Sequence, residues 1–403
     1  MTPANETLAG VPPAPAPLAQ LCAATGGAPV QGNLAGPFSG AALDTRALAP
    51  GAVFFALRGT RTDGHRFLAA ARRAGAAGAV VERRAPCPPG FPVFRVRSTA
   101  AALAQGAAWY RRRHALPVVA VTGSNGKSTT KELLARVLRD AVGRVAATPG
   151  NLNNRLGLSL SLFQLKPQTR IGVFELAMNR PGEIRRLARM ALPGIGVILN
   201  AGRAHLRAFR GVAGVARAKA ELLEALPAGG WAVLNADDRA VWRLRGLAAA
   251  RVLGFGAARG DVRAEDVRVD RAGRARFRLR TPSGGARVRL SLPGAHHALN
   301  AAAAAGAAWT LGVSPAAIAS ALEACRPALH LRLEPRRLPG GVRALVDCYN
   351  ANPDSCRAAF DHLRACGVRG PVLVLGEMRE LGRHAVRAHR DVGAEVRDAA
   401  LEV

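Results

Sequence analysis

The sequence has no run of about 18 uncharged apolar residues, the length that a membrane-spanning helix requires. Its first residues are rich in alanine and proline, and they lack the basic start and continuous apolar run of a signal peptide. We therefore expect a cytoplasmic protein without membrane insertion, in which residues 1–17 form a disordered extension. The 403 residues are too many for one ordinary core and predict two or three domains.

Cysteine pairs with metal-binding spacing are also absent, because none of the six cysteines belongs to a CxxC pair. Aromatic residues make up only 4% of the chain, so side chains that could stack on nucleic-acid bases are scarce. The net charge of +30 comes from basic residues that are spread along the sequence without clustering. We therefore expect no nucleic-acid partner. A basic nucleic-acid-binding protein stays as an alternative, which a steeply salt-dependent affinity for RNA or DNA would support.

Lysine is the scarcest charged residue, since only four of the 57 basic side chains are lysine. Arginine can replace lysine wherever only a positive charge is needed, but it cannot supply a compact ammonium group or a reactive primary amine. The remaining lysines are therefore candidates for chemistry. They are Lys127, Lys131, Lys166 and Lys219.

The order of the apolar segments predicts an α/β fold with a central, doubly wound and mostly parallel sheet. Short apolar runs alternate with segments of helical periodicity. The expected strands of this sheet are residues 117–121, 171–176, 196–200 and 232–235, and the expected helices are 128–140, 184–191 and 212–226. Arginine or polar residues alternate with apolar ones over 262–292, which predicts a β-hairpin before a helix at 298–311.

Breaks in this pattern divide the chain into three domains. We expect a small N-terminal α/β domain at 18–113, a central nucleotide-binding domain at 114–325 and a C-terminal domain at 326–403. The last should hold strands at 343–346 and 372–375 and a helix at 354–366. Two strands are a small layer for a core, so we expect the C-terminal domain to be incomplete.

A glycine-rich turn joins the first central strand to its helix. Glycines let the backbone wrap around phosphates, and the amide groups at the start of a helix offer partial positive charge. Lys127 would reach the outer phosphates and Ser128 would offer its hydroxyl to Mg²⁺. The alternative is an ordinary turn before a helix. The presence of Lys127, one of only four lysines in the chain, makes this alternative less favoured. The predicted ATP-binding loop is Thr122, Gly123, Ser124, Asn125, Gly126, Lys127 and Ser128.

The run TGSNGKSTTKE resembles the ATP loop of the Mur ligase family, and later segments resemble further motifs of this family in the same order. The segment with Asn153 and Asn154 resembles the motif that approaches the muramoyl substrate. The resemblance implies ATP and two Mg²⁺ ions as cofactors. The metal ligands that it implies are Ser128, Glu175, His205 and a carbamylated Lys219. The catalytic residues that it implies are Lys127, Lys219 and His205.

Chemistry supports part of this assignment. Carbamylation needs an uncharged primary amine, which arginine could not supply at position 219, and it converts the side chain into a carboxylate-like ligand. Each of the three residues also has a purely structural alternative. Lys219 could be a surface lysine without a role, His205 a loop histidine whose hydrogen bonds are made within the protein, and Glu175 a carboxylate exposed to solvent at the end of a strand.

The C-terminal half resembles the same family. Asn300 matches its adenine-side motif, although His297 stands where the family has asparagine, and Arg332 and Asp347 match its further ATP-binding positions. The run YNANP after Asp347 resembles the member that adds D-alanyl-D-alanine. The substrate-binding residues that the resemblance implies are Tyr349, Asn350 and Asn352, together with Asp44, Thr45 and Arg46 in a UDP-sugar-binding segment. A turn-and-cap role is the alternative for Asp44.

The implied activity is an ATP-dependent amide ligase. It would join D-alanyl-D-alanine to the terminal carboxylate of UDP-N-acetylmuramoyl-tripeptide through an acyl phosphate, in cytoplasmic peptidoglycan precursor synthesis. We expect a monomer. Two further alternatives stay open: a truncated or degenerate Mur ligase homologue that binds ATP without turnover, and another Mur-type ligase such as folylpolyglutamate synthetase.

Overall fold

The computed structural model describes residues 15–203, 207–209, 211–326, 330–368 and 370–398. The chain forms two compact units, which we describe one at a time. The first consists of residues 1–118, 146–174 and 186–192, and the second of residues 119–145, 175–185 and 193–403. The boundaries of the three expected domains stay a prediction.

The first unit contains a five-stranded sheet in the order β2-β7-β6-β5-β4. Its strands are β2 (Ala28–Gln31), β4 (Gly40–Ala42), β5 (Ala52–Phe55), β6 (Gly78–Val81) and β7 (Val93–Arg95). Strands β4 to β7 run parallel, and β5 and β6 are buried throughout, as is typical of parallel strands covered on both faces. A separate antiparallel pair joins β1 (Ala16–Pro17) to β3 (Pro37–Phe38). The expectation of disorder was therefore wrong for residues 16–17, because they pair with a second strand; residues 1–14 lie outside the described part.

The α-helices of the first unit are α1 (Leu18–Ala24), α2 (Leu68–Arg73), α3 (Thr99–Arg112) and α5 (Arg155–Phe163). Short 3-10 helices cover η2 (Thr45–Ala47) and η3 (Gly64–Phe67). Near the end of α3 the guanidinium of Arg111 is buried and donates hydrogen bonds to the carbonyls of His114 and Ala191. Burial lowers the pKa of Arg111 to about 10. Arg111 thus fastens the end of α3 to the segment that leads into the central sheet.

The central sheet has nine strands in the order β16-β15-β14-β13-β12-β11-β8-β10-β9. The strands are β8 (Val118–Thr122), β9 (Val145–Ala147), β10 (Ile171–Glu175), β11 (Ile195–Ile198), β12 (Trp231–Asn235), β13 (Arg251–Gly256), β14 (Val262–Val269), β15 (Arg274–Thr281) and β16 (Gly284–Pro293). Pairing is parallel from β8 through β11, β12 and β13 to β14, and antiparallel between β14, β15 and β16. This confirms the mostly parallel sheet. The predicted hairpin is in fact three strands, and β13 was not predicted.

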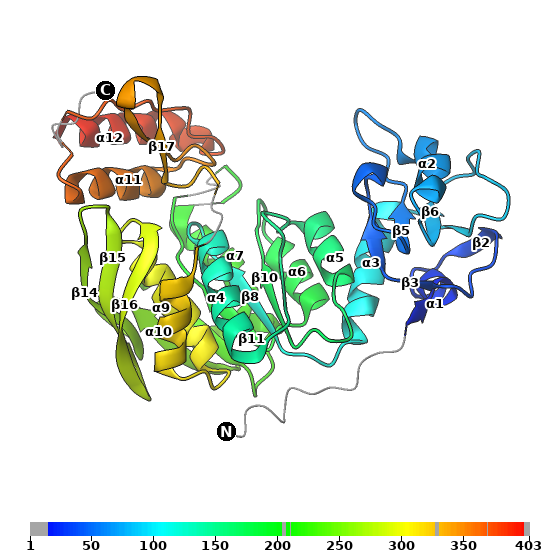
Figure 1. The fold of residues 1–403 in the computed structure, drawn as a ribbon, viewed down its shortest axis with the longest axis horizontal. Coiled ribbons are helices and arrows are strands. Elements are labelled where there is room, and N and C mark those ends of the chain that lie inside the picture. Colours follow the sequence, from blue (N-terminus) through cyan, green and yellow to red (C-terminus); the bar gives the residue numbers. More distant parts are fainter. Residues whose placement is uncertain (1–14, 204–206, 210, 327–329, 369, 399–403) are drawn as a thin grey trace. The chain divides into compact units, whose positions relative to one another are not determined.

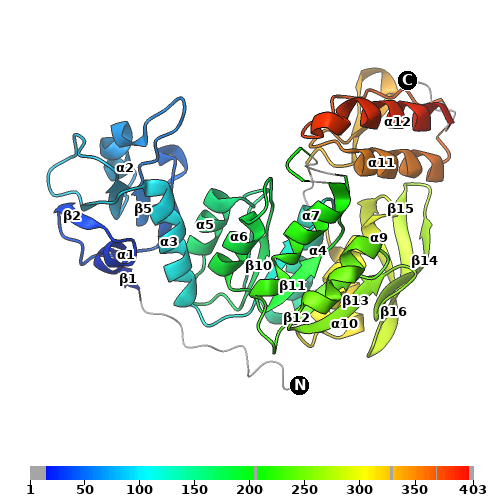
Figure 2. The same cartoon turned by 180° about the vertical axis from the view of Figure 1, so that it is seen from behind.

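The helices of this region are α4 (Lys127–Val142), α6 (Glu183–Ala191), α7 (Gly211–Ala220), α8 (Arg239–Trp242), α9 (His297–Trp309) and α10 (Pro315–Ala324), with 3-10 turns η4 (Leu223–Ala225) and η5 (Arg243–Leu247). Figure 1 and Figure 2 show them from opposite sides. The alanine-rich α9 is almost entirely buried and packs against α4, β13 and β14. Small side chains suit this position because they let the helix approach its neighbours closely.

The last part of the second unit contains β17 (Glu334–Arg337), β18 (Arg343–Val346), α11 (Pro353–Ala365), α12 (Ala385–Asp398) and the turns η6 (Pro339–Gly341) and η7 (Gly382–His384). Strands β17 and β18 pair antiparallel. The predicted strand at 372–375 was wrong: the segment is irregular, and Val372 and Val374 are 78% and 94% exposed, so the apolar run has no surface to pack on. Among the described helices, none combines the length and apolar character needed to cross a bilayer.

Candidate active site

The predicted phosphate-binding loop lies between β8 and α4, in the expected turn from strand to helix. Gly126 has φ of +82°, and a Cβ at this position would collide with the side chain of Asn300. Glycine is therefore the residue that fits both the backbone conformation and the space. The helix begins directly afterwards at Lys127, so its first amide groups point into the loop.

Asn200 holds this loop from the neighbouring strand. Its Oδ1 accepts hydrogen bonds from the backbone N–H groups of Ser124 (2.9 Å) and Asn125 (2.8 Å), and its Nδ2 donates to the Asn125 carbonyl (3.1 Å). Asn200 follows β11, which pairs with β8. The sequence analysis did not single it out as a site residue. Its signal was a polar residue just past the carboxyl end of a buried parallel strand, where α/β sheets present their functional groups.

Lys127 folds back over the loop. Its Nζ donates to the carbonyls of Gly123 (2.8 Å) and Ser124 (3.2 Å). Burial lowers the pKa of Lys127, while the nearby carboxylate of Glu175 acts in the opposite direction. Glu175, at the end of β10, is only 1% exposed. The predicted phosphate-binding lysine and the predicted metal-binding carboxylate therefore lie near each other.

Lys219 belongs to the same group of charges. It lies on α7, is 2% exposed, and has a pKa well below the usual lysine range because of burial and the nearby positive charge of Lys127. A lysine in this environment favours its neutral amine. Two of the four lysines in the chain are thus brought together, whereas the predicted partner His205 lies outside the described residues.

Glu221, two residues after Lys219, fixes the segment that follows β10. Its carboxylate accepts hydrogen bonds from the backbone N–H groups of Gly182 (2.7 Å) and Arg185 (3.0 Å) at the start of α6. A carboxylate at this end of a helix also interacts favourably with the helix dipole. This contact connects α7 to the loop that leads away from Glu175.

The YNANP motif reaches the phosphate loop through Asn352. Its Nδ2 donates to Asn125 Oδ1 (2.8 Å), and Asn125 Nδ2 donates back to Asn352 Oδ1 (3.3 Å). Asn352 also caps α11, where it forms a capping box with Ser355. Two residues later, Asp354 Oδ2 accepts from the backbone N–H of Arg203 (2.8 Å). The start of α11 is therefore bonded to two loops at the carboxyl ends of the central strands.

The other predicted ATP and substrate residues of the second unit include two that lie beside the loop: Asn300 borders Gly126, and the positive charge of Arg332 helps to lower the pKa of Lys127. The guanidinium of Arg332 lies 4.1 Å from the centre of the Tyr349 ring, a cation–π contact. Asp347 accepts a hydrogen bond from Leu333 N (3.3 Å), and burial raises its pKa. Asn350 is exposed. Asn300 Nδ2 and His297 Nδ1 lie 3.1 Å apart, so the histidine that replaces the family's asparagine contacts the predicted adenine-side residue.

The predicted substrate residues of the first unit have local partners. Asp44 caps η2 by accepting from Arg46 N (3.0 Å) and pairs with the Arg46 guanidinium, which lowers the pKa of Asp44 to about 2. The turn-and-cap alternative for Asp44 is thus what the structure displays. Thr45 lies within η2, and Asn154 caps α5 by accepting from Gly157 N (2.9 Å). Asn153 donates its backbone N–H to the Asn151 carbonyl.

Protein-family comparisons match nearly the whole chain. Residues 37–121 match the Mur ligase family catalytic domain, 121–308 the Mur ligase middle domain, and 331–403 the Mur ligase glutamate ligase domain. The chain belongs to the Mur ligase family. It is 38% identical to the UDP-N-acetylmuramoyl-tripeptide–D-alanyl-D-alanine ligase of Mycobacterium tuberculosis, covering 87% of this chain and 74% of the relative. The enzyme of the same name from Escherichia coli is also 38% identical, with 89% and 79% covered.

Solved structures give the same result. A crystal structure of MurF from Acinetobacter baumannii superposes with a TM-score of 0.87 at 35% identity, covering 97% of this chain and 85% of that one. MurF from Thermotoga maritima in complex with ADP gives a TM-score of 0.75 at 31% identity, covering 89% and 82%. Folylpolyglutamate synthase from Mycobacterium tuberculosis, at 17% identity and a TM-score of 0.55, shares the fold alone.

Proposed function

We propose that this protein is the ATP-dependent ligase that joins D-alanyl-D-alanine to the terminal carboxylate of UDP-N-acetylmuramoyl-tripeptide. Relatives of this activity are 38% identical over most of the chain. The observation that carries the proposal is the grouping of the phosphate loop, Lys127, Glu175 and Lys219 with the start of α11, which bears the YNANP motif. We further propose that it acts as a monomer in the cytoplasm, in peptidoglycan precursor synthesis.

ATP would be held mainly by backbone groups. The amides of residues 122–128 and the start of α4 would surround the phosphates, and Lys127 Nζ would exchange its two carbonyl partners for phosphate oxygens. Because Lys127 already lies over the loop, this exchange requires only a rotation of its side chain. Asn300, Arg332 and Asp347 would complete the nucleotide site.

The donor set fits Mg²⁺. A buried carboxylate, Glu175, and the Ser128 hydroxyl are hard oxygen ligands, and a buried neutral amine at Lys219 could react with carbon dioxide to give a carbamate oxygen ligand. His205 would complete the site. When bound, Mg²⁺ supplies charge neutralisation at the transferring phosphoryl group. The protein's own contribution is to keep Lys127, Glu175 and Lys219 close together and away from bulk water.

The reaction balances in two steps. A carboxylate oxygen of the tripeptide attacks the γ-phosphorus of ATP, the bond to the ADP oxygen breaks, and an acyl phosphate forms. The dipeptide amine then attacks the carbonyl carbon, phosphate leaves with its bonding electron pair, and the amine loses a proton. We assign substrate positioning to Tyr349, Asn350 and Asn352 in the second unit and to Asp44, Thr45, Arg46, Asn153 and Asn154 in the first.

The test is phosphate release from ATP with Mg²⁺ and UDP-N-acetylmuramoyl-tripeptide, with and without D-alanyl-D-alanine. We expect release that requires the dipeptide and a product heavier than the tripeptide substrate by the dipeptide less one water. ATP binding without turnover under all conditions would instead identify a degenerate homologue. Sedimentation of the active protein at assay concentration checks the monomer.

A further inference from the structure

Strands β14 to β16 present arginines on one face. In β15 the side chains alternate strictly, with Ala275, Phe277 and Leu279 buried and the arginines between them exposed. The alternation continues in β16, whereas in β14 a bulge between Glu265 and Arg268 interrupts it. We call the resulting set the arginine grid: Arg263, Arg268, Arg274, Arg276, Arg278, Arg280, Arg287 and Arg289. The expectation that basic residues do not cluster was therefore wrong here, because the pleat of the sheet gathers residues that are dispersed in sequence.

The strand register places these arginines directly opposite one another. Arg268 faces Arg276, and Arg276 faces Arg289 on its other side. The pairs Arg263 with Arg280 and Arg278 with Arg287 repeat this arrangement. Like charges directly across an antiparallel pair destabilise a sheet. Glu265 lies opposite Arg278 and beside Arg263 and Arg280, so the repulsion is only partly relieved within the protein, and an anionic ligand would relieve it further.

The protein neutralises only part of this charge. Asp270 pairs with Arg274 (2.9 Å) and lies near Arg276 and Arg289. Glu265 pairs with Arg263 (2.7 Å) and lies 3.8 Å from Arg280. Within the described part of the chain, three members form no ion pair: Arg268, Arg278 and Arg287. The eight arginines of the grid and the two carboxylates that pair with them sum to a net charge of +6.

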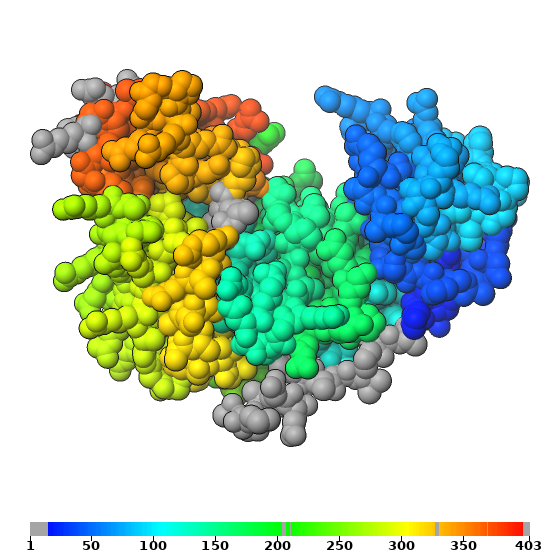
Figure 3. Space-filling view, in the orientation of Figure 1, coloured from blue at the N-terminus to red at the C-terminus, as the bar shows by residue number. Residues whose placement is uncertain are grey.

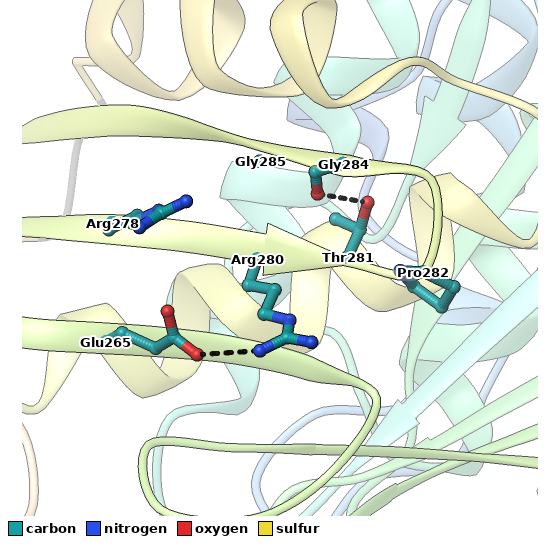
Figure 4. A pocket seen from close by; sticks show the side chains of 7 residues that line it. All are labelled: Glu265, Arg278, Arg280, Thr281, Pro282, Gly284 and Gly285. Atoms are coloured by element: carbon teal, nitrogen blue, oxygen red, sulfur yellow. Dashed lines mark hydrogen bonds and ion pairs between the residues drawn. The ribbon is translucent and has the colours of Figure 1, made fainter.

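The grid forms a broad surface and not a groove. Adjacent strands lie about 4.8 Å apart, and side chains on one face repeat about every 6.8 Å along a strand. One end is open to solvent at a depression lined by Glu265, Arg278, Arg280 and the β15–β16 turn (Figure 4). In the space-filling view these yellow-green strands form an outer surface of the second unit (Figure 3). No aromatic side chain belongs to the grid, and the aromatic residue of β15, Phe277, is buried.

We propose that the arginine grid binds the surface of a phospholipid bilayer that carries anionic headgroups. A two-dimensional array of guanidinium groups is complementary to a two-dimensional array of phosphates, and guanidinium pairs with phosphate in bidentate geometry. Single-stranded nucleic acid is disfavoured because stacking aromatics are absent from this face. The grid has no exposed apolar side chain that would enter the hydrocarbon, so the association is peripheral and sensitive to salt.

The test is flotation of the full chain with vesicles of pure phosphatidylcholine and of an equimolar mixture of phosphatidylcholine and phosphatidylglycerol. We expect binding to the mixed vesicles alone, which weakens as salt is raised. The triple variant Arg268→Gln, Arg278→Gln, Arg287→Gln removes three charges that form no ion pair in the described part of the chain, and Glu265, which lies opposite Arg278, keeps its ion pair with Arg263. Its affinity for the mixed vesicles should fall about 100-fold, since each basic residue at an anionic surface contributes roughly a fivefold step and three such steps multiply.

A matched control removes three charges elsewhere in the second unit. Arg139→Gln, Arg144→Gln and Arg243→Gln replace exposed arginines outside the grid, and this variant should lose less than about threefold, the effect of net charge alone. Equal losses in the two triple variants would overturn the proposal, as would unchanged vesicle binding by the grid variant. Competition with duplex DNA and RNA completes the test. Grid-dependent binding to nucleic acid without binding to mixed vesicles would also overturn it.

Discussion

The two units use their motif residues differently. In the first unit, Asp44 and Asn154 accept hydrogen bonds from backbone N–H groups two or three residues away, and their side chains cap the N-termini of short helices. In the second unit, Asn125 bonds to Asn200 and Asn352, which are 75 and 227 residues away in sequence. A side chain that caps its own helix stabilises the local structure, and this is sufficient to account for it. A side chain that joins loops far apart in the sequence instead holds together the residues of a site. The second unit therefore carries the stronger evidence for catalysis.

The largest effect should come from Lys127. Lys127→Ala removes the ammonium group that would meet the phosphates, and we expect kcat for dipeptide-dependent phosphate release to fall about 1000-fold or more. The matched control is Lys166→Ala in the first unit, where Lys166 Nζ donates a hydrogen bond to the exposed Ser39 carbonyl (3.0 Å). This control should keep activity within about twofold of the unmodified enzyme. A small effect at Lys127 would remove the catalytic distinction between the units.

The second-largest effect should come from substitution of Lys219. Lys219→Ala deletes the proposed carbamate, and we expect kcat to fall about 100-fold or more. If a carboxylate-like ligand is what the site lost, added acetate should restore part of the rate by occupying the vacated space. Lys219→Arg fills that space with a cation and should not respond to acetate. An acetate response equal in both variants would contradict the carbamate.

The Asn125–Asn352 pair tests whether α11 and the phosphate loop act together. Asn352→Asp keeps a good helix cap but removes the donor to Asn125 Oδ1, so kcat/KM should fall about tenfold while the unfolding temperature changes little. Asn125→Ala alone and in combination with Asn352→Asp completes a double-mutant cycle. We expect a coupling energy of about 1 kcal/mol in transition-state stabilisation. Simple additivity would mean that the pair does not contribute to catalysis.

His296, the residue before α9, predicts a pH dependence of stability in the second unit. Burial and the nearby His362 lower the pKa of His296 to about 4, while Asp361 acts weakly in the opposite direction. Between about pH 6.5 and 4 the unfolded chain therefore binds a proton at this position that the folded chain does not, so stability falls as the pH falls. His296→Gln should reduce this loss by about 2 kcal/mol in urea unfolding at pH 7 and pH 5. The reference is the unmodified protein, whose loss of stability between pH 7 and pH 5 should exceed that of His296→Gln.

The smallest effect belongs to the first unit. Asn154→Ala removes the cap of α5 and should lower the free energy of unfolding by about 1 kcal/mol, whereas Asn154→Asp preserves it. Thermal unfolding and KM for the UDP-linked tripeptide are measured for both variants. A KM that rises only when the cap is lost indicates a structural role. A KM that rises about tenfold in the stable aspartate variant would show that Asn154 also contacts substrate.

The sequence predicted the parallel strands because each is a continuous apolar run next to a glycine-rich or polar break, as in β8. It did not predict β13, whose run from Arg251 to Gly256 begins with a charge and contains two glycines. The strand predicted at 372–375 was wrong although this segment is apolar. Apolar residues form a strand only where a neighbouring surface covers them, and Val372 and Val374 are exposed. Local patterns contain no information about the partner surface.

In the candidate site, too, the sequence predicted contiguous motifs and missed contacts between distant segments. The phosphate loop could be proposed from the sequence because its residues are contiguous, and Lys219 became a candidate because it matches a family motif and lysine is rare in this chain. The contribution of Asn200 and the bond between Asn125 and Asn352 depend on which loops meet, which is set by the strand order β11-β8-β10 and the position of α11. The arginine grid was missed because only the register of three strands aligns its members.

The most direct test of the catalytic account is to follow an oxygen atom. UDP-N-acetylmuramoyl-tripeptide is labelled with oxygen-18 in its terminal carboxylate and incubated with the protein, ATP, Mg²⁺ and D-alanyl-D-alanine. An acyl phosphate route transfers one labelled oxygen to each phosphate released, because the carboxylate oxygen that attacks the γ-phosphorus leaves with it. We expect each released phosphate to carry one oxygen-18 atom. The second labelled oxygen should remain in the carbonyl of the new amide bond. Unlabelled phosphate accompanying the ligated product would contradict the acyl phosphate route.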